Sequence, residues 1–203
     1  MGNNRQERRA ALTERLVKAA EALIAENGLR GLKAREITAR AECALGALYT
    51  AVEDLDQLII LVNSRTLGRL AQSLRAAVPE NAGPQETLHA LAQGYGQFAI
   101  ANPHLWWAIF NHRLPEGAEV PDWHKAEYPV LIAEIIAPLA ELRPDLDPET
   151  LRIRAQTLFA AVHGVVQLSI HGRYVGTPDV LLAREVEALV DVMIRGIPSI
   201  EAT

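Results

Sequence analysis

The spacing of hydrophobic residues predicts α-helices along almost the whole chain, beginning with a long helix at residues 6–27. One face of this segment is apolar at intervals of three and four residues, and it carries Leu12, Leu16, Ala19, Ala20, Leu23 and Ile24. Asn27 and Gly28 then favour the left-handed conformation that ends many helices. We therefore expect an amphipathic helix that buries this stripe against neighbouring elements.

Two short helices follow, at residues 34–41 and 45–52. Each carries one apolar pair four residues apart, namely Ile37 with Ala41 and Leu48 with Val52. Helices of this length are not stable by themselves in water. They need the 6–27 helix to pack on, so the three segments together predict a compact unit that ends in a helix-turn-helix.

Six further helices are predicted after residue 54. Their approximate ranges are 55–78, 84–102, 103–110, 129–142, 148–174 and 178–196. The first would span about 35 Å and could connect the N-terminal unit to a distant body. Between the helices at 103–110 and 129–142, Pro115, Gly117 and Pro121 predict an irregular segment. We expect an all-α fold of about nine helices.

Composition adds limits on the class of protein. Hydrophobic residues make up 49% of the 203 residues, enough for a large core, and the single cysteine, Cys43, excludes a disulfide framework. The six histidines show no pairing with carboxylates at metal-ligand spacing. The N-terminus is polar, and no apolar run approaches the roughly 18 residues of a membrane span. We expect a soluble cytoplasmic protein with no metal, no cofactor and no membrane contact.

The net charge of −5 is unevenly distributed along the chain. Up to Thr50 there are nine Lys and Arg against six Glu, whereas the remainder holds eleven against nineteen acidic residues. A basic N-terminal part on an acidic body suits a protein that meets phosphates at one end only.

A set of motif residues lies between residues 10 and 60. It comprises the run Glu26–Leu32, then Arg35-Glu-Ile37, Ala41 and Gly46-Ala-Leu-Tyr49, with Leu58 beyond them. This set resembles the N-terminal DNA-binding domain of the tetracycline-repressor (TetR) family of bacterial regulators. In the C-terminal part, Phe159–Gly164 with Gly172 resembles the His-Gly-bearing (WHG-like) regulatory domain of one branch of that family.

The resemblance implies two domains. Residues 1–54 would form the helix-turn-helix DNA-binding domain, and residues 55–203 a helical effector-binding and dimerisation domain that begins with the linking helix 55–78. The partners would be a double-stranded DNA operator, a small-molecule effector and a second copy of the chain in a homodimer.

The candidate DNA contacts lie in and around the helix-turn-helix. Tyr49 and Thr50 carry hydroxyls that can reach phosphates or base edges, Leu45 can meet a thymine methyl, and Gly46 allows close approach of the backbone. The whole candidate set is Arg8, Arg9, Lys33, Arg35, Ala44, Leu45, Gly46, Tyr49 and Thr50. For each of them the alternative is an ordinary solvated or half-buried position, and for the arm of residues 1–9 it is a frayed terminus.

The sequence also departs from the family pattern around this motif. Glu42-Cys43-Ala44 stands where the turn usually has Gly-Val-Ser, and Ala51 and Val52 replace residues that are commonly His or aromatic. Leu55 occupies a position where a phosphate-contacting Lys is common. These departures motivate an alternative function, an effector-binding or interaction dimer with weakened or lost operator recognition.

Two candidate sites lie in the body. Aromatic residues, few elsewhere, gather between residues 106 and 128, and the candidate ligand residues are Trp106, Trp107, Phe110, His112, Trp123, Tyr128, His163 and Gln167. The alternative for this cluster is plain core. The last two helices have broad apolar faces, and the candidate dimer residues on them are Leu158, Val162, Val166, Leu182, Val186, Leu189 and Met193.

These features predict a DNA-binding transcriptional regulator and not an enzyme. The sequence contains no nucleophile elbow, no phosphate-binding Gly loop and no Ser/His/Asp grouping, so no catalytic residues are expected. We expect a repressor that is released by a small apolar or amphipathic effector bound in the C-terminal domain.

Overall fold

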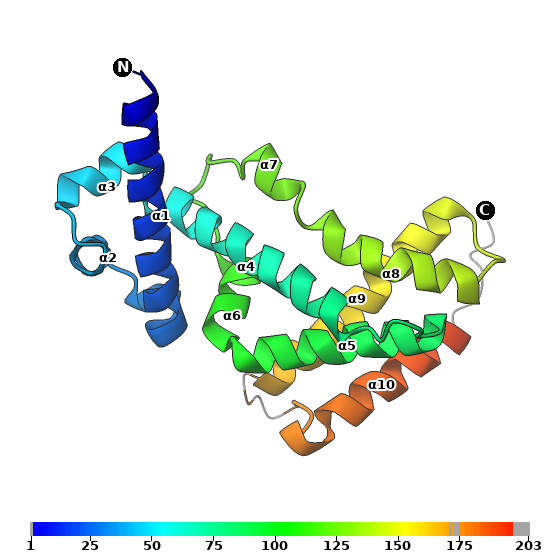
Figure 1. Cartoon of the computed structure of the whole chain (residues 1–203). Coiled ribbons are helices and arrows are strands. Elements are labelled where there is room, and N and C mark those ends of the chain that lie inside the picture. Colours follow the sequence, from blue (N-terminus) through cyan, green and yellow to red (C-terminus); the bar gives the residue numbers. More distant parts are fainter. Residues whose placement is uncertain (1, 171, 173–174, 197–203) are drawn as a thin grey trace. The chain divides into compact units, whose positions relative to one another are not determined.

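The computed structural model describes residues 2–170, 172 and 175–196, and its regular secondary structure within these ranges is helical throughout (Figure 1). The elements are α1 Gly2–Asn27, η1 Leu29–Gly31, α2 Ala34–Arg40, α3 Leu45–Ala51, α4 Leu55–Ala77, α5 Pro84–Ala101, α6 Pro103–Asn111, α7 Asp122–Lys125, α8 Pro129–Leu142, α9 Pro148–Ile170 and α10 Asp179–Gly196. The expected all-α fold is confirmed.

The nine expected helices are all present in the described ranges, and α7 is an additional single turn in the segment that we expected to be irregular. α1 begins at Gly2, so the residues expected to form an arm belong to the helix. The helix expected at residues 148–174 has its expected end outside the described residues. Among those residues, no helix is both long and apolar enough to cross a membrane.

By contacts, the chain divides into two compact units. The first unit is Met1–Gly68 with Asn102–Lys125, and the second is Arg69–Ala101 with Ala126–Thr203. Residues 102–125 thus pack with the N-terminal helices, so the units divide the chain differently from the functional domains that we expected at residues 1–54 and 55–203. That functional boundary stays a prediction.

The first unit is built around the apolar stripe of α1. Leu16, Ala20 and Ile24 are buried against side chains from α2, α3, α4 and α6. The larger buried partners are Ile37, Leu48, Leu58, Val62 and Leu105. Because α2 and α3 bury their apolar pairs on this stripe, their polar and small residues face outward.

Gly28 follows the last residue of α1 with a positive φ of 67° and an extended ψ of −178°, a conformation that favours glycine. Its backbone N–H still donates to the carbonyl of Ile24 at 2.8 Å, which satisfies one carbonyl of the last helical turn. A Cβ at this position would lie 3.7 Å from the His104 ring, so glycine is required by the backbone conformation rather than by crowding.

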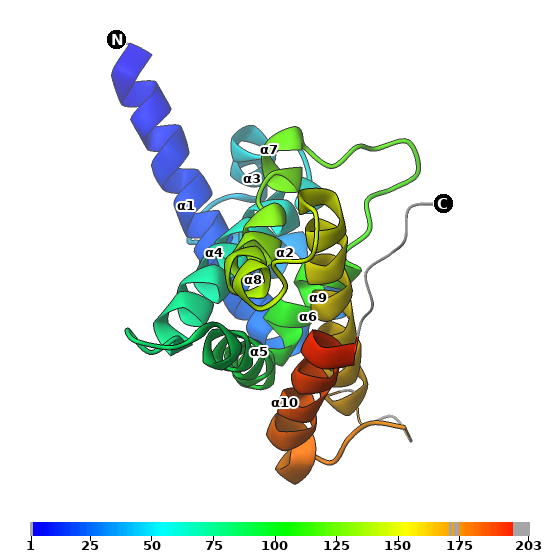
Figure 2. The same cartoon turned by 90° about the vertical axis from the view of Figure 1, so that its right-hand side faces the viewer.

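The second unit consists of the end of α4 with α5, α8, α9 and α10. α5 packs on α8, α9 and α10, and α9 and α10 lie side by side (Figure 1 and Figure 2). Its buried side chains include Leu88, Leu139, Val166, Val186 and Val190.

A polar contact also joins α5 and α10 in this unit. His89 Nε2 lies 2.7 Å from Asp191 Oδ1, and the amide of Gln85 donates to the same oxygen at 2.8 Å. These hydrogen bonds, with that from His89 the larger cause, lower the pKa of Asp191.

Candidate functional site

The outer face of α3 gathers five of the residues expected to contact DNA. Ala44, Gly46 and Thr50 are exposed, and Leu45 and Tyr49 are 41% and 52% exposed. The opposite face carries the buried side chains Leu48, Ala51 and Val52. The short helix therefore anchors itself through one face and presents the other to solvent.

Gly46 is exposed in the first turn of α3. A Cβ built on it would meet nothing within 4 Å, so packing within the chain does not require a glycine there. The Thr50 hydroxyl donates to the carbonyl of Gly46 at 3.0 Å, as threonines in helices often do. Thr50 can rotate this hydroxyl outward when a stronger partner arrives.

The turn between α2 and α3 contains a non-glycine residue in the left-handed region. Glu42 has a φ of 51°, and its side chain is exposed. The N–H of Cys43 donates to the Thr38 carbonyl at 3.0 Å, and the half-buried Cys43 packs against the core of the first unit. The sequence thus keeps the geometry of the turn without the glycine that would adopt it most easily.

A two-pronged ion pair fixes the end of α2 to α1. Arg40 Nη1 and Nη2 donate to Glu26 Oε1 and Oε2 at 2.8 and 3.0 Å. The hydrogen bonds from Arg40 are the largest cause of a lowered pKa at Glu26. Arg40 is consequently occupied in holding the motif together.

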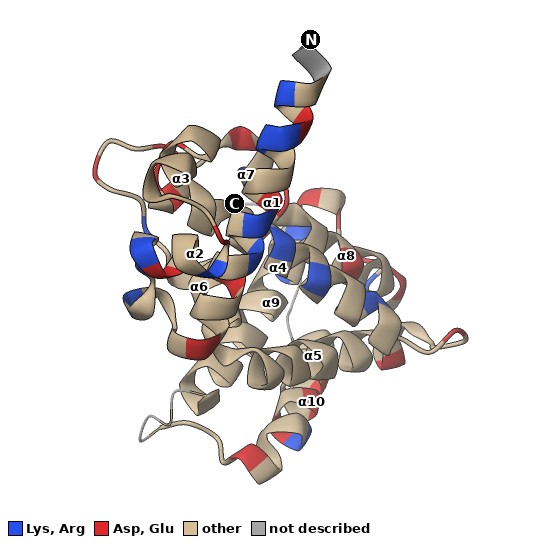
Figure 3. Cartoon of the chain, turned by 60° about the vertical axis from the view of Figure 1, so that its left-hand side comes forward, with Lys and Arg blue, Asp and Glu red and all other residues tan. Residues whose placement is uncertain are grey.

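The first turns of α1 lie beside the end of α3. Arg9 Nη2 donates to the carbonyl of Ala51 at 3.3 Å, where the negative end of the α3 dipole favours a cation. Arg5, Arg8 and Thr50 line the same open groove, and Arg8 is exposed. Figure 3 shows the Lys and Arg positions on α1 and α2.

Lys33 and Arg35 flank the start of α2. Lys33 is the N-cap residue, and its ammonium lies 3.1 Å from Glu36 Oε1 in an exposed pair. Arg35 is exposed and makes no side-chain ion pair within the described residues. Arg35 is therefore the readier of the two to meet an external anion.

Acidic residues occupy the link from α3 to α4. Asp54 Oδ1 accepts a hydrogen bond from the Gln57 backbone N–H at 2.7 Å, and Gln57 Oε1 accepts one from the Glu53 N–H at 2.7 Å. This reciprocal cap starts α4. Leu55 is half-buried and packs against the core of the first unit.

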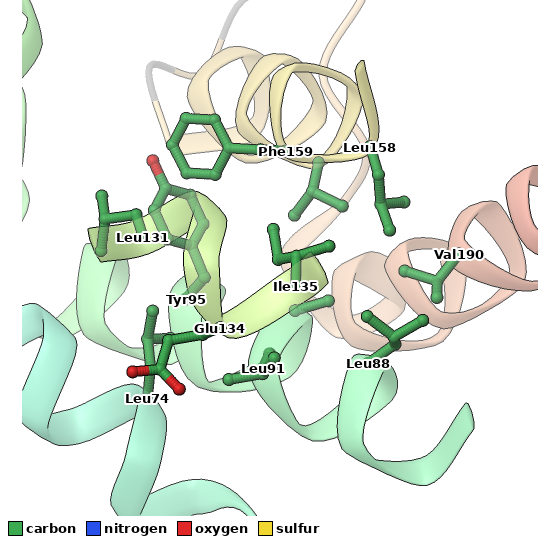
Figure 4. Close-up of a pocket in the computed structure, with 12 residues that line it drawn as sticks. Leu74, Leu88, Leu91, Tyr95, Leu131, Glu134, Ile135, Leu158, Phe159 and Val190 are labelled. Atoms are coloured by element: carbon green, nitrogen blue, oxygen red, sulfur yellow. The ribbon is translucent and has the colours of Figure 1, made fainter. Parts of the chain in front are cut away.

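A pocket lies within the second unit (Figure 4). The space inside it that can take the centre of a water molecule is about 30 Å³, and part of the pocket opens to solvent. Its lining residues come from α4, α5, α8, α9 and α10 and are Leu74, Leu88, Leu91, Ala92, Tyr95, Leu131, Glu134, Ile135, Leu158, Phe159, Val162 and Val190. The wall is almost entirely apolar, as in many small-molecule sites.

Two polar pairs adjoin this wall. Tyr95 Oη lies 2.6 Å from His163 Nδ1, and burial lowers the pKa of His163. Arg75 Nη1 donates to Glu134 Oε1 at 3.0 Å. Each pair places polar atoms beside the apolar wall.

Comparison with known proteins decides the family. The family model described as "Tetracyclin repressor-like, C-terminal domain" matches residues 88–196, which is more than half of the chain. The chain belongs to the TetR family of transcriptional regulators. The matched region includes His163 and Gly164, although the assignment to the His-Gly-bearing branch stays a prediction.

Solved structures agree with the TetR fold. A protein of unknown function from Rhodococcus sp. RHA1 aligns at a TM-score of 0.73 and 24% identity, over 92% of this chain and 95% of that one. The regulator FadR from Bacillus subtilis, solved with stearoyl-CoA, aligns at 0.69 and 15%, over 91% and 99%. A putative TetR-family regulator from Vibrio parahaemolyticus aligns at 0.62 and 22%, over 89% and 97%. Comparison with curated proteins gives no match.

Five of the eight candidate ligand residues of this TetR-family chain lie in the first unit, and their role as ligand contacts stays a prediction. Trp106 is fully buried in the first unit, with its ring 5.7 Å from that of Phe110, and Trp107 is half-buried on the same helix, α6. His112 Nε2 donates to Asp56 Oδ1 at 2.7 Å, and Trp123 is 48% exposed on α7.

The other three ligand candidates belong to the second unit. His163 contacts the lining residues Tyr95 and Phe159, Gln167 is half-buried one turn further along α9, and Tyr128 precedes α8. None of the eight is among the lining residues. Reasoning from the sequence missed Tyr95, Leu131 and Phe159, whose only signal was membership of apolar helix faces.

The candidate dimer residues are mostly used within the chain itself. Five are buried in the single chain, and Leu189 and Met193 are half-buried. The buried five are Leu158, Val162, Val166, Leu182 and Val186. The exposed large apolar residues of the same two helices are Ile153, Leu168, Val180, Leu181 and Val192. Any partner of α9 and α10 would meet these residues first.

Proposed function

We propose that this TetR-family regulator binds operator DNA as a homodimer through the outer face of α3 and acts as a repressor. The observation that carries the proposal is the exposed set Leu45, Gly46, Tyr49 and Thr50 on a helix whose other face is buried. A helix presented in this way fits the major groove as the second helix of a helix-turn-helix.

The side chains divide into two groups by role. Leu45 and Thr50 would contact base edges, with Leu45 on a thymine methyl, while Gly46 lets the backbone approach. Tyr49 would donate its hydroxyl to a phosphate, and the cations Arg8, Lys33 and Arg35 would meet phosphates on the flanking strands. Arg9 supports α3 from behind through its hydrogen bond to Ala51.

The second copy of the chain would pack on α9 and α10. Their exposed faces carry Ile153, Leu168, Leu181 and Val192, with the small residues Ala160 and Gly164 between the first two on α9. Small residues let helices approach closely, and an exposed apolar face of this kind is typical of an interface. Two-fold symmetry would then place two α3 helices on half-sites about 34 Å apart, or a multiple of that spacing.

The effector would be a small apolar or amphipathic molecule bound in the pocket of the second unit. The apolar wall supports this, and FadR from Bacillus subtilis, which shares the fold, was solved with stearoyl-CoA. At 15% identity that likeness shows the fold alone, so the ligand class here rests on the lining.

A ligand can act on DNA binding only if it binds two states of the protein with different affinities. α5 lines the pocket and ends at Ala101, and α6 begins at Pro103, so only Asn102 separates the two helices. α6 packs on α1, where His104 Nδ1 lies 2.9 Å from the Ala25 carbonyl. Movement of α5 around a ligand would therefore be passed directly to the unit that carries α3.

Gel-shift assays with the DNA upstream of the protein's own gene test this function. We expect binding that prefers that sequence over random DNA, weakens steeply with salt and is reduced by the effector. Absence of salt-sensitive, sequence-preferring binding, with and without candidate effectors, would reject the proposal.

A second candidate function is an effector-binding dimer without operator recognition. The observation that favours it is the acidic border of α3, where Glu42, Glu53 and Asp54 are exposed and Leu55 replaces a cation. It predicts thermal stabilisation by ligand without DNA affinity. Combining Glu42→Gly with Leu55→Lys should then create DNA binding, and no gain would count against this candidate.

A further inference from the structure

We propose that the effector is an organic cation, an apolar body with a protonated amine, and that its ammonium pairs with Glu134. This inference rests on the proposed function of the pocket as the effector site. It adds the sign of the effector's charge and the residue that selects it.

Among the described residues that line the pocket, Glu134 is the only charged one. Its side chain projects from α8 and is 30% exposed, and Figure 4 shows its carboxylate beside Leu74 at the edge of the apolar wall. A carboxylate that is partly shielded from water, as here, gains more from a cation than one on the open surface. The described lining residues therefore provide a charged partner for an ammonium and no cationic side chain for an anionic group.

The carboxylate is already paired, but by a residue that a ligand can replace. Arg75 reaches Glu134 with one nitrogen at 3.0 Å, and its side chain is 54% exposed. An ion pair this exposed is weak, because water screens it and the long side chain loses freedom. When Arg75 swings out into water, a ligand ammonium can take its place at small cost.

The charge of the whole unit favours the same sign. The residues of the second unit include eight Lys and Arg against thirteen Asp and Glu, a net charge of −5, whereas the first unit has twelve of each. The entire net charge of the chain thus belongs to the unit that holds the pocket. Such a potential raises the local concentration of cations and lowers that of carboxylates.

The other polar pair at the pocket does not change this sign. Tyr95 Oη shares its hydrogen bond with His163 Nδ1, and the imidazole is half-buried. A tyrosine hydroxyl is uncharged and can complement a neutral polar group. It offers no full positive charge to an anionic head group.

Three probes with the same chain and different head groups test the inference on the full-length protein, namely octylamine, octanol and octanoate. Binding is measured directly by calorimetry at neutral pH, without DNA, below the concentration at which the probes self-associate. We expect octylamine to bind about tenfold more tightly than octanol, as for one hydrogen bond to a charged group, and octanoate to bind more weakly than octanol.

Two variants move the amine affinity in opposite directions. Glu134→Gln should lower octylamine affinity about tenfold, to the level of octanol, and leave octanol unchanged. Arg75→Gln should raise octylamine affinity, because it removes the competing cation. Glu141→Gln is the matched control, since Glu141 is an exposed carboxylate on the same helix that does not line the pocket. It should change nothing.

The outcomes separate the charge preference from the pocket itself. Ala92→Leu fills the cavity and should abolish binding of all three probes. Two results would reject the proposal of a cationic effector but not that of the effector pocket. One is that octanol or octanoate binds the wild-type protein as tightly as octylamine. The other is that Glu134→Gln and Arg75→Gln leave the octylamine affinity unchanged. If no probe binds, or if Ala92→Leu changes nothing, the effector pocket and the cation both fail.

Discussion

Tyr95 and His163 join α5 to α9 through a 2.6 Å contact between Oη and Nδ1. Phe159, one turn before His163, stacks on the imidazole with ring centroids 5.9 Å apart and meets the Tyr95 ring edge-on at 5.5 Å. Burial in this aromatic setting lowers the pKa of His163, because the charged imidazolium would lose its hydration. The pair therefore couples the pocket wall to the solution pH.

Acid should destabilise the folded protein through His163. Its pKa in the folded protein lies below the ordinary value of 6.5, so the unfolded chain binds the proton more readily. Stability is lost as pH falls from about 6.5 toward the folded-state pKa and then levels off with respect to this group. Urea unfolding of the wild-type protein and of His163→Asn between pH 7 and 5 measures this pH dependence of the free energy of unfolding. We expect a flatter dependence in the variant, and equal slopes would contradict the assignment.

Gly46→Ala should separate folding from DNA binding. A methyl group at Gly46 meets nothing in the chain, and alanine is the better helix former, so stability should rise by about 0.5–1 kcal/mol. DNA affinity should fall, because the methyl group keeps the α3 backbone away from the duplex. Gly68→Ala is the matched control, since Gly68 is also helical, exposed and open, and it should gain stability with unchanged DNA affinity. Equal DNA affinity of both variants would argue against Gly46 as a contact.

Glu42→Gly should stabilise the turn between α2 and α3. The left-handed backbone of Glu42 costs about 1–2 kcal/mol, which glycine would avoid. The greater freedom of glycine in the unfolded chain opposes this stabilisation by about 0.5–1 kcal/mol. A net increase of about 0.5–1 kcal/mol in the free energy of unfolding should follow. Glu42→Ala keeps the Cβ and removes only the carboxylate, so chemical denaturation should show no comparable gain. The same gain in both variants would show that charge, not backbone, is responsible.

Arg8 and Arg9 should differ in what they support. Arg8→Gln should weaken DNA binding for all sequences alike and reduce the salt slope by about 1, with the melting temperature unchanged. Arg9→Gln should cost about 1 kcal/mol of stability as well, because the hydrogen bond to the Ala51 carbonyl is lost. Salt titrations of DNA binding together with thermal melts check both. A loss of stability in Arg8→Gln alone would reverse the assignment.

Val192→Arg should prevent dimer formation without unfolding the chain. Val192 of α10 is 63% exposed, so an arginine there can extend into solvent in the single chain but introduces a charge into the proposed interface. Sedimentation should show a folded single chain. Val130→Arg, the same change at an exposed position of α8, should leave the dimer intact. A dimer that survives Val192→Arg would place the interface elsewhere.

The helices of this fold could be predicted from the local spacing of hydrophobic residues, whereas the packing of one helix on another could not. Residues such as Leu16, Leu48 and Leu58 sit at helical spacing, and that spacing alone predicted the helices and the exposed face of α3. The aromatic residues of α6 gave no sign of where they pack. Trp106 proved to be core of the first unit because α6 lies against α1, a contact between residues far apart in the sequence.

The pocket and the proposed dimer surface could not be located from the sequence for a related reason. The pocket draws its lining from five helices, so no single stretch of sequence carries its signature. On α9 and α10 the apolar residues occupy several faces of each helix. Only burial within the chain distinguishes Val166, which is packed inside, from Leu168, which is exposed. The broad apolar faces that suggested an interface thus serve the core first.

The central claim, a dimer that reads DNA through α3, is tested most directly by hydroxyl-radical footprinting on the DNA upstream of the protein's own gene. We expect two symmetric protected half-sites about one helical turn, or a multiple of it, apart, with two chains per duplex and weaker protection by Tyr49→Ala at the same protein concentration. A footprint that persists unchanged in Tyr49→Ala, or no footprint at low salt, would contradict it.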